Sequence, residues 1–176
     1  APAAAAPERL PGEAILARDH AGARVLLVED SPINQEVALS LLEGVGLQVE
    51  VAGNGVEAVE RVLRGAYDLV LMDMQMPVMD GVEATRAIRR AGQRSVPIVA
   101  MTANAFAEDR QRCLDAGMND HLSKPVDPAA LYAKLIQWLP RPQPVAAPRP
   151  APQVAAPEAG AAVEAAPPAA PVPAAD

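Results

Sequence analysis

The sequence predicts an α/β fold: a five-stranded parallel sheet flanked by five helices, built as a (βα)5 three-layer sandwich. Two observations lead to this prediction. Short apolar runs alternate with segments whose apolar residues recur at helical spacing, and this strand–helix unit occurs five times between residues 23 and 139. Three of the runs are nearly continuous, which is typical of parallel strands that helices cover on both faces. Such alternation gives a parallel sheet with right-handed crossovers.

Each predicted strand is followed by a predicted helix. The strands cover residues 24–30, 47–53, 67–73, 96–102 and 119–125. The first helix has Ser31 as its N-cap, Pro32 at its first position and Gly46 at its end. One face of this helix is expected to carry Ile33, Val37, Leu41, Leu42 and Val45, and one face of the next Val56, Val59 and Leu63. The later helices are expected at about 82–90, 105–116 and 128–139.

Composition divides the chain into three parts. Residues 1–22 and 140–176 are dominated by Ala and Pro, and neither segment has the apolar pattern of a core. Proline at this density favours extended, polyproline-like conformations. We therefore predict an N-terminal linker at 1–22, a folded domain at 23–139 and an Ala/Pro-rich disordered linker or tail at 140–176. Because the chain does not begin with Met, we expect it to be an excerpt from a longer chain or a processed product.

Charge and composition exclude several classes of function. The net charge of -7 argues against nucleic acid as a partner, because phosphate backbones are held by clustered Lys and Arg. The single Cys113 cannot form an internal disulfide, which is typical of a reducing compartment. No apolar run approaches the roughly 20 residues that cross a bilayer, and the N-terminus does not resemble a signal peptide. We expect a cytoplasmic segment without direct membrane contact.

Polar residues close several of the predicted strands and should meet at one edge of the sheet. They are Glu29, Asp30, Asp73, Thr102 and Lys124. Three clustered carboxylates repel one another, and a bound cation relieves this repulsion. An oxygen-only set with few protein ligands suits Mg²⁺, which shares its other positions with water and phosphate. Together with a lysine and a hydroxyl, the set predicts a phosphoryl site in which an Asp is the nucleophile.

Three stretches carry a family resemblance. They read "LLVEDSPINQEVALSLLEGVGLQVEVAGNGVEAVE", "YDLVLMDMQMPVMDGVEATRAIR" and "PIVAMTANAFAEDRQRCLDAGMNDHLSKPVDPAALYAKL". Over residues 23–139 the chain resembles the receiver domain of response regulators, and most closely the receivers within hybrid sensor histidine kinases. The resemblance implies a flavodoxin-like fold and a signalling module that accepts a phosphoryl group from a phosphohistidine with Mg²⁺ bound.

The resemblance also implies roles for single residues. Asp73 would be the phosphoacceptor, Thr102 would hydrogen-bond to the phosphoryl oxygens, and Lys124 would pair with them. Mg²⁺ would be held by Asp30, Asp73 and the backbone carbonyl of Gln75, with Glu29 acting through a metal-bound water. The Lys124–Pro125 peptide bond would be cis.

Two further roles follow from the resemblance. His121 lies where the family usually has Tyr or Phe, a residue that turns inward when Thr102 moves towards the phosphoryl group. On the first helix, Ile33, Asn34 and Val37 would dock a partner, either the dimerisation domain of a histidine kinase or a histidine phosphotransfer domain. Phosphorylation would change the surface formed by the fourth helix, fifth strand and fifth helix.

Two alternatives to the phosphoacceptor remain open. A degenerate receiver would act only as a protein-binding module. A phosphohydrolase of the haloacid dehalogenase type would also use an Asp nucleophile, with a second Asp two residues later, where this chain has Gln75. The chain contains no ATP-binding motif, so we expect no free-standing enzyme, and we expect the parent chain to be a hybrid histidine kinase.

Overall fold

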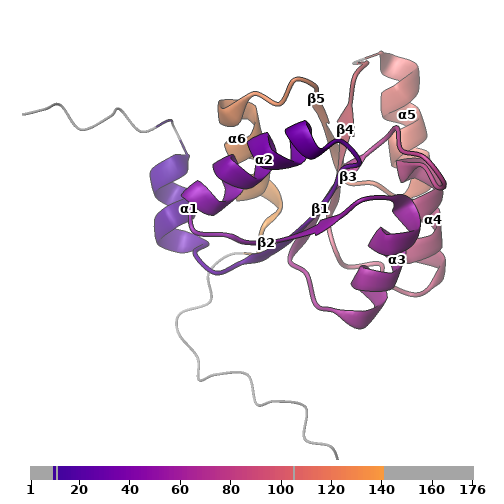
Figure 1. Ribbon diagram of the computed structural model, residues 1–176, viewed down its shortest axis with the longest axis horizontal. Coiled ribbons are helices and arrows are strands. Elements are labelled where there is room, and N and C mark those ends of the chain that lie inside the picture. The colour runs from indigo at the N-terminus through magenta and orange to yellow at the C-terminus, as the bar shows by residue number, and fades with distance from the viewer. Residues whose placement is uncertain (1–9, 11, 105, 141–176) are drawn as a thin grey trace, which may run out of the picture. The chain divides into compact units, whose positions relative to one another are not determined.

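The computed structural model describes residues 10, 12–104 and 106–140, and the predictions for residues 1–9, 11, 105 and 141–176 lie outside this range. One sheet of five strands forms the centre (Figure 1). The strands are β1 (Arg24–Val28), β2 (Gln48–Ala52), β3 (Leu69–Asp73), β4 (Ile98–Thr102) and β5 (Asp120–Ser123). Their spatial order is β2-β1-β3-β4-β5, and every neighbouring pair is parallel. The predicted fold class is confirmed.

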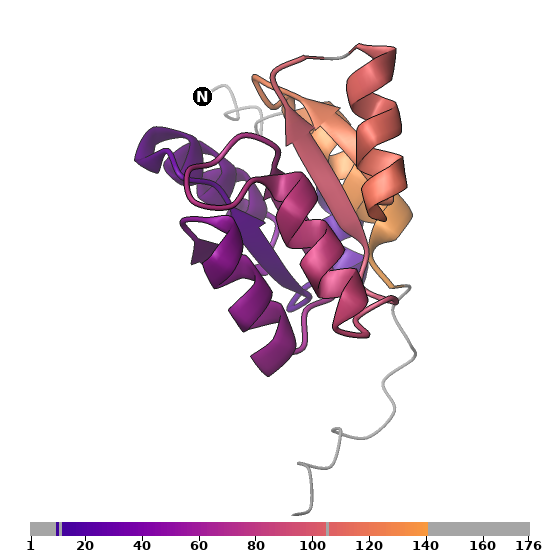
Figure 2. The same ribbon diagram turned by 90° about the vertical axis from the view of Figure 1, so that its right-hand side faces the viewer.

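Helices cover both faces of the sheet. They are α1 (Glu13–Asp19), α2 (Pro32–Gly44), α3 (Gly55–Arg64), α4 (Gly81–Arg90), α5 (Ala107–Ala116) and α6 (Pro128–Trp138). Helices α1, α2 and α6 lie on one face and α3, α4 and α5 on the other, as the two views show (Figures 1 and 2). Alternate residues of β1 enter the two cores: Val25 and Leu27 pack with α2 and α6, whereas Leu26 and Val28 pack with α3 and α4.

Helix α1 corrects the predicted N-terminal linker and raises the number of helices from five to six. Leu16 is fully buried in the same core cluster as Leu131 and Tyr132 of α6. Gly12 precedes the helix at φ 93°, and an added Cβ there would lie 3.0 Å from Cδ1 of Ile136. A helix this short gains little from its own hydrogen bonds, so packing against α6 stabilises it.

Helix α2 differs from the prediction in its end and in its buried face. It ends at Gly44, and Gly46 lies in the following turn at φ 83°. Leu42 and Ala38 face the core, but Ile33 and Val37 are 74% and 52% exposed. The buried side of the helix is therefore narrower than the apolar pattern indicated.

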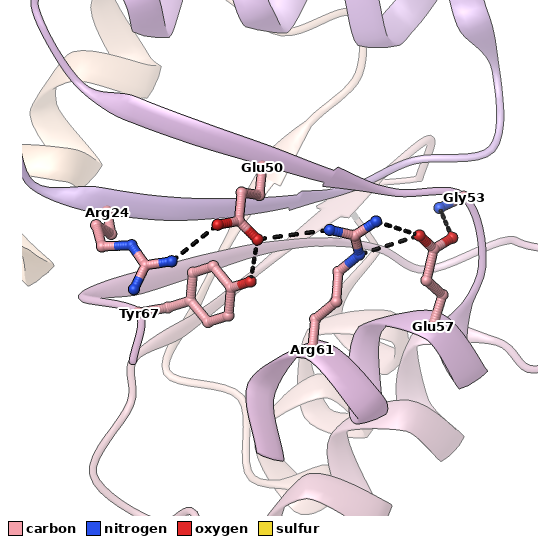
Figure 3. Close-up of polar contacts among 6 residues, drawn as sticks. All are labelled: Arg24, Glu50, Gly53, Glu57, Arg61 and Tyr67. Carbon is pink, nitrogen blue, oxygen red and sulfur yellow. Dashed lines mark hydrogen bonds and ion pairs between the residues drawn. The ribbon is translucent and has the colours of Figure 1, made fainter. Parts of the chain in front are cut away.

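A chain of polar contacts joins β1, β2, the segment just before β3, and α3 (Figure 3). Arg24 lies 2.8 Å from a carboxylate oxygen of Glu50, and Tyr67 donates a hydrogen bond to the other oxygen. Arg61 contacts Glu50 at 3.4 Å and Glu57 at 2.6 Å. Ion pairs as exposed as these contribute little to the stability of the fold individually. Their shared partners tie the edge strand β2 to its neighbours.

Candidate phosphoacceptor site

The predicted acidic residues meet at the carboxyl edge of the sheet. Strands β1 and β3 are neighbours, and the strand order reverses at this pair, where open α/β sheets bind ligands. Glu29 and Asp30 follow β1, and Asp73 ends β3. One carboxylate oxygen from each of the three lies within 4.8 Å of the other two. Asp73 and Glu29 are buried, whereas Asp30 is exposed.

Lys124 bridges the two buried carboxylates. Its Nζ lies 2.8 Å from Oε2 of Glu29 and 2.9 Å from Oδ2 of Asp73. Its backbone N–H donates to the carbonyl of Thr102 at 2.7 Å, which places the lysine at the end of β5 beside β4. The Lys124–Pro125 peptide bond is cis.

The ionisation of these groups follows from their contacts. Burial raises the pKa of Asp73, and the charge of Glu29 adds to this effect against the hydrogen bond from Lys124. Burial also acts to raise the pKa of Glu29, but hydrogen bonds from Lys124 and the N–H of Ser31 outweigh it and lower the pKa. For Lys124, contacts with both carboxylates outweigh burial and raise the pKa.

Further contacts fix Glu29 in place. The N–H of Ser31 donates to its Oε1 at 3.1 Å, and Nδ2 of Asn34 lies 3.4 Å from the same oxygen. The Nε2 of Gln35 donates to the backbone carbonyl of Glu29 at 2.6 Å. The role of Gln35 could not be predicted from the sequence, because no motif marks a side chain that binds a backbone carbonyl.

The loop after β3 depends on a glycine. The N–H of Gln75 donates to Oδ1 of Asp73 at 3.2 Å, so this carboxylate is held by its own loop. The first residue of α4, Gly81, passes so close that an added Cβ would lie 2.2 Å from the carbonyl oxygen of Asp73. Asp80 caps α4 by accepting a hydrogen bond from the N–H of Glu83.

Thr102 is buried at the end of β4, but its hydroxyl is turned to its own loop. The Oγ1 donates to the carbonyl of Asn104 at 2.7 Å and accepts from the N–H of Asn104 at 3.1 Å. Thr102 and Asn104 line the same cavity of about 680 Å³ as Asp30 and Gln75. Thr102 thus lines the site, but its hydroxyl binds Asn104 and, within the residues that the structure describes, forms no hydrogen bond with Asp73.

His121 lies on β5, half-buried, with Nδ1 3.6 Å from Oδ1 of Asp120. Burial lowers the pKa of the imidazole, and the charge of Arg110 adds to this effect. Asp120 accepts hydrogen bonds from Nζ of Lys134 at 2.6 Å and Nε1 of Trp138 at 3.0 Å. No hydrogen bond joins His121 to Thr102 within the described part of the chain.

The exposed residues predicted for docking lie beside the acceptor site. Asn34 and Val37 line a small cavity of about 160 Å³ together with Glu29, Lys124 and Pro125. Ile33 lies one turn from Val37 on the exposed side of α2. The site and the exposed face of α2 are therefore continuous.

The donor set fits Mg²⁺. The three clustered carboxylates are hard oxygen ligands, and the neighbouring cavity leaves room for water and phosphate oxygens. In the residues that the structure describes, no helix is both long and apolar enough to span a membrane.

Comparison with known proteins identifies relatives of the whole folded domain. The response regulator receiver domain family matches residues 25–136. Sensor protein GacS of Pseudomonas syringae pv. syringae is 44% identical over 65% of this chain and 13% of its own length. Hybrid signal transduction histidine kinase B of Dictyostelium discoideum is 46% identical over 65% of this chain and 6% of its own. The chain thus corresponds to a small part of these relatives.

Two solved structures bear on the site. The receiver domain of sensor histidine kinase PA1611 from Pseudomonas aeruginosa PAO1, with magnesium coordinated in its active site cleft, is 48% identical at a TM-score of 0.63. This match covers 67% of this chain and 98% of the PA1611 receiver chain. The Saccharomyces cerevisiae Ssk1 receiver, solved in complex with the histidine phosphotransfer protein Ypd1, is 36% identical at a TM-score of 0.64. This match covers 67% of this chain and 89% of the matched chain. This chain belongs to the response regulator receiver domain family and is a receiver of two-component phosphorelay signalling.

Proposed function

We propose that this receiver takes a phosphoryl group from a phosphohistidine onto the carboxylate of Asp73. The observation that carries the proposal is the place of Asp73: it is buried at the carboxyl edge of the sheet, in contact with Lys124 and close to the acidic pair Glu29 and Asp30. A buried carboxylate next to a fixed ammonium and a cation site suits nucleophilic attack on phosphorus.

The transfer is an in-line displacement. An oxygen of Asp73 forms a bond to phosphorus while the P–N bond of the phosphohistidine breaks, and the bonding electron pair returns to the imidazole nitrogen. Lys124 moves from the free carboxylate to an oxygen of the new acyl phosphate. Asp30, Asp73 and the carbonyl of Gln75 would hold Mg²⁺ directly, and Glu29 through water. When bound, the ion neutralises charge on the phosphoryl oxygens.

The response of the domain begins at Thr102. Its hydroxyl exchanges the carbonyl of Asn104 for a phosphoryl oxygen, and this movement leaves room for His121 to turn inward. Strand β5, which carries His121, contacts both α5 and α6. The movement of His121 therefore biases the surface of α5, β5 and α6 between two states. Chemical shifts along this surface, with and without a phosphoryl mimic, test the switch separately from acceptance.

The partner would bind α2 through Ile33, Asn34 and Val37. We propose that it is the dimerisation domain of a histidine kinase or a histidine phosphotransfer domain, and that the parent chain is a hybrid histidine kinase whose receiver lies in the cytoplasm. The support is the exposed apolar face of α2 next to the acceptor and the hybrid kinases among the relatives.

The direct test is the intact mass after incubation with Mg²⁺ and acetyl phosphate. One phosphoryl addition is expected for the wild type and for Asp115→Asn, a matched exposed carboxylate on α5. Neither Asp73→Asn nor the wild type in EDTA should gain it. Equal labelling of Asp73→Asn would overturn the assignment. Absence of labelling both from acetyl phosphate and from a phosphorylated histidine phosphotransfer domain would instead favour a protein-binding module.

A further inference from the structure

Gln35 makes an unusual contact for a residue in the first turns of α2. Its side chain reaches back past the helix start, and Nε2 donates to the backbone carbonyl of Glu29 at 2.6 Å. Its own N–H donates to the carbonyl of Ser31 at 2.9 Å, so the backbone of Gln35 is fixed by the helix while its amide binds the end of β1. The side chain is half-buried.

The carbonyl of Glu29 belongs to the peptide unit that begins Asp30. A peptide unit is planar, so fixing the direction of this carbonyl fixes the direction of the Asp30 N–H and limits where the Asp30 side chain can lie. The N–H of Glu29 donates to the carbonyl of Ala52 at 3.0 Å. The backbone is therefore held by β2 just before this peptide unit and by Gln35 within it.

Asp30 depends on this support. Its carboxylate is exposed, and within the described residues it forms no hydrogen bond or ion pair. Glu29, by contrast, has its carboxylate held by Lys124, Ser31 and Asn34. Among the described residues, the backbone is therefore the part of Asp30 that is held in place, and it limits where the Asp30 oxygens can lie relative to Asp73.

We propose that Gln35 is a positioning residue of the cation site, which acts through the carbonyl of Glu29 on the Asp30 carboxylate. The inference rests on the proposed function, because it takes Asp30 as a direct ligand of Mg²⁺. Groups that orient metal ligands typically change metal affinity by about 10- to 100-fold when they are removed. Mg²⁺ leaves an incompletely oriented site easily because it demands near-octahedral geometry.

The test compares Gln35→Met with wild type by titrating Mg²⁺ against backbone amide NMR signals. Methionine is about as long as glutamine but donates no hydrogen bond. The Kd of the Gln35→Met variant for Mg²⁺ should rise by about 10-fold or more relative to wild type. In labelling by acetyl phosphate, the Mg²⁺ concentration for half-maximal rate should rise while the rate at saturating Mg²⁺ stays close to that of wild type. Gln111→Met, an exposed glutamine on α5, should match wild type in both.

The outcomes separate this inference from the proposed function. If Gln35→Met is folded and binds Mg²⁺ as tightly as wild type, the positioning role is wrong while the phosphoacceptor assignment stands. If wild type itself shows no Mg²⁺ binding, the proposed function fails. Should Gln35→Met not fold, Gln35→Asn decides the question, because it keeps the amide but is one methylene too short to reach the carbonyl. Unchanged affinity in Gln35→Asn would likewise overturn the role.

Discussion

The ammonium group of Lys124 lies 2.9 Å from the carboxylate of Asp73, so this buried carboxylate is held in an ion pair at the carboxyl edge of the sheet. The same ammonium serves Glu29 at 2.8 Å. One positive charge thus faces a cluster of three carboxylates, two of them buried. The site is left with excess negative charge, which favours a cation and opposes folding when no cation is bound.

Asp73→Asn is expected to stabilise the protein in EDTA at pH 7 by about 1 kcal/mol, a usual size for a single substitution. The pKa of Asp73 is raised by burial and by Glu29. A carboxyl whose folded pKa lies above its unfolded value favours folding only while protonated, and this contribution is lost as pH rises through the folded pKa. Urea unfolding followed by the fluorescence of Trp138, the single tryptophan, measures the difference.

Saturating Mg²⁺ should reduce or reverse the gain in stability that Asp73→Asn shows in EDTA. Wild type has the complete set of ligands and gains more stability from binding than the variant does. Asp115→Asn, which removes an exposed carboxylate, is the control and should change stability little in either condition. Lower stability of Asp73→Asn in EDTA would show that the contact with Lys124 outweighs burial and repulsion.

Gly81→Ala should destabilise the fold by about 3 kcal/mol or more. An added Cβ would lie 2.2 Å from the carbonyl oxygen of Asp73 and 3.0 Å from Cγ of Met72, so β3 or α4 must shift. Gly44→Ala is the matched control, because no atom lies within 4 Å of its added Cβ, and it should be neutral or stabilising by up to about 1 kcal/mol. Equal unfolding midpoints for the two variants would contradict the close approach of Gly81 to the carbonyl of Asp73.

The acidic cluster could be predicted because two simple patterns determine it. Strand periodicity places Asp73 at a strand end, and the parallel topology brings the ends of β1 and β3 together. Helix α1 could not be predicted in this way, since only Leu16 of its residues is buried and its partners come from α6 at the other end of the folded domain. The contact of Gln35 was missed for a related reason: its partner is a backbone atom, whose position depends on the folded turn.

Asp120→Asn should lower stability at pH 7 by about 1–2 kcal/mol. Burial acts to raise the pKa of Asp120, but hydrogen bonds from Lys134, Trp138 and the N–H of His121 outweigh it and lower the pKa. The resulting stability is present above the unfolded pKa of about 3.9 and is lost as pH falls through the folded pKa. Unfolding of both proteins between pH 7 and pH 3 should therefore show the difference shrinking. A difference that does not depend on pH would contradict the ionic origin.

Ile33→Glu should slow phosphoryl transfer from a phosphorylated histidine phosphotransfer domain by about tenfold, the effect of about 1.4 kcal/mol. Ile33 is 74% exposed on α2 beside the acceptor, and a charge there removes apolar contact with a docked partner. Asn34 is a poorer probe because its amide contacts Glu29, so its substitution would disturb the site itself. Val37→Glu should have the same effect as Ile33→Glu.

The comparison of two donors separates docking from chemistry. Acetyl phosphate needs no protein surface, so its labelling of Asp73 should proceed at the wild-type rate in Ile33→Glu. Leu63→Glu places the same charge on α3, across the sheet, at a leucine that is 47% exposed, and it should leave both donors unaffected. Equal slowing with both donors would place the defect in the acceptor site, and an unchanged rate with the phosphotransfer domain would remove α2 as the docking face.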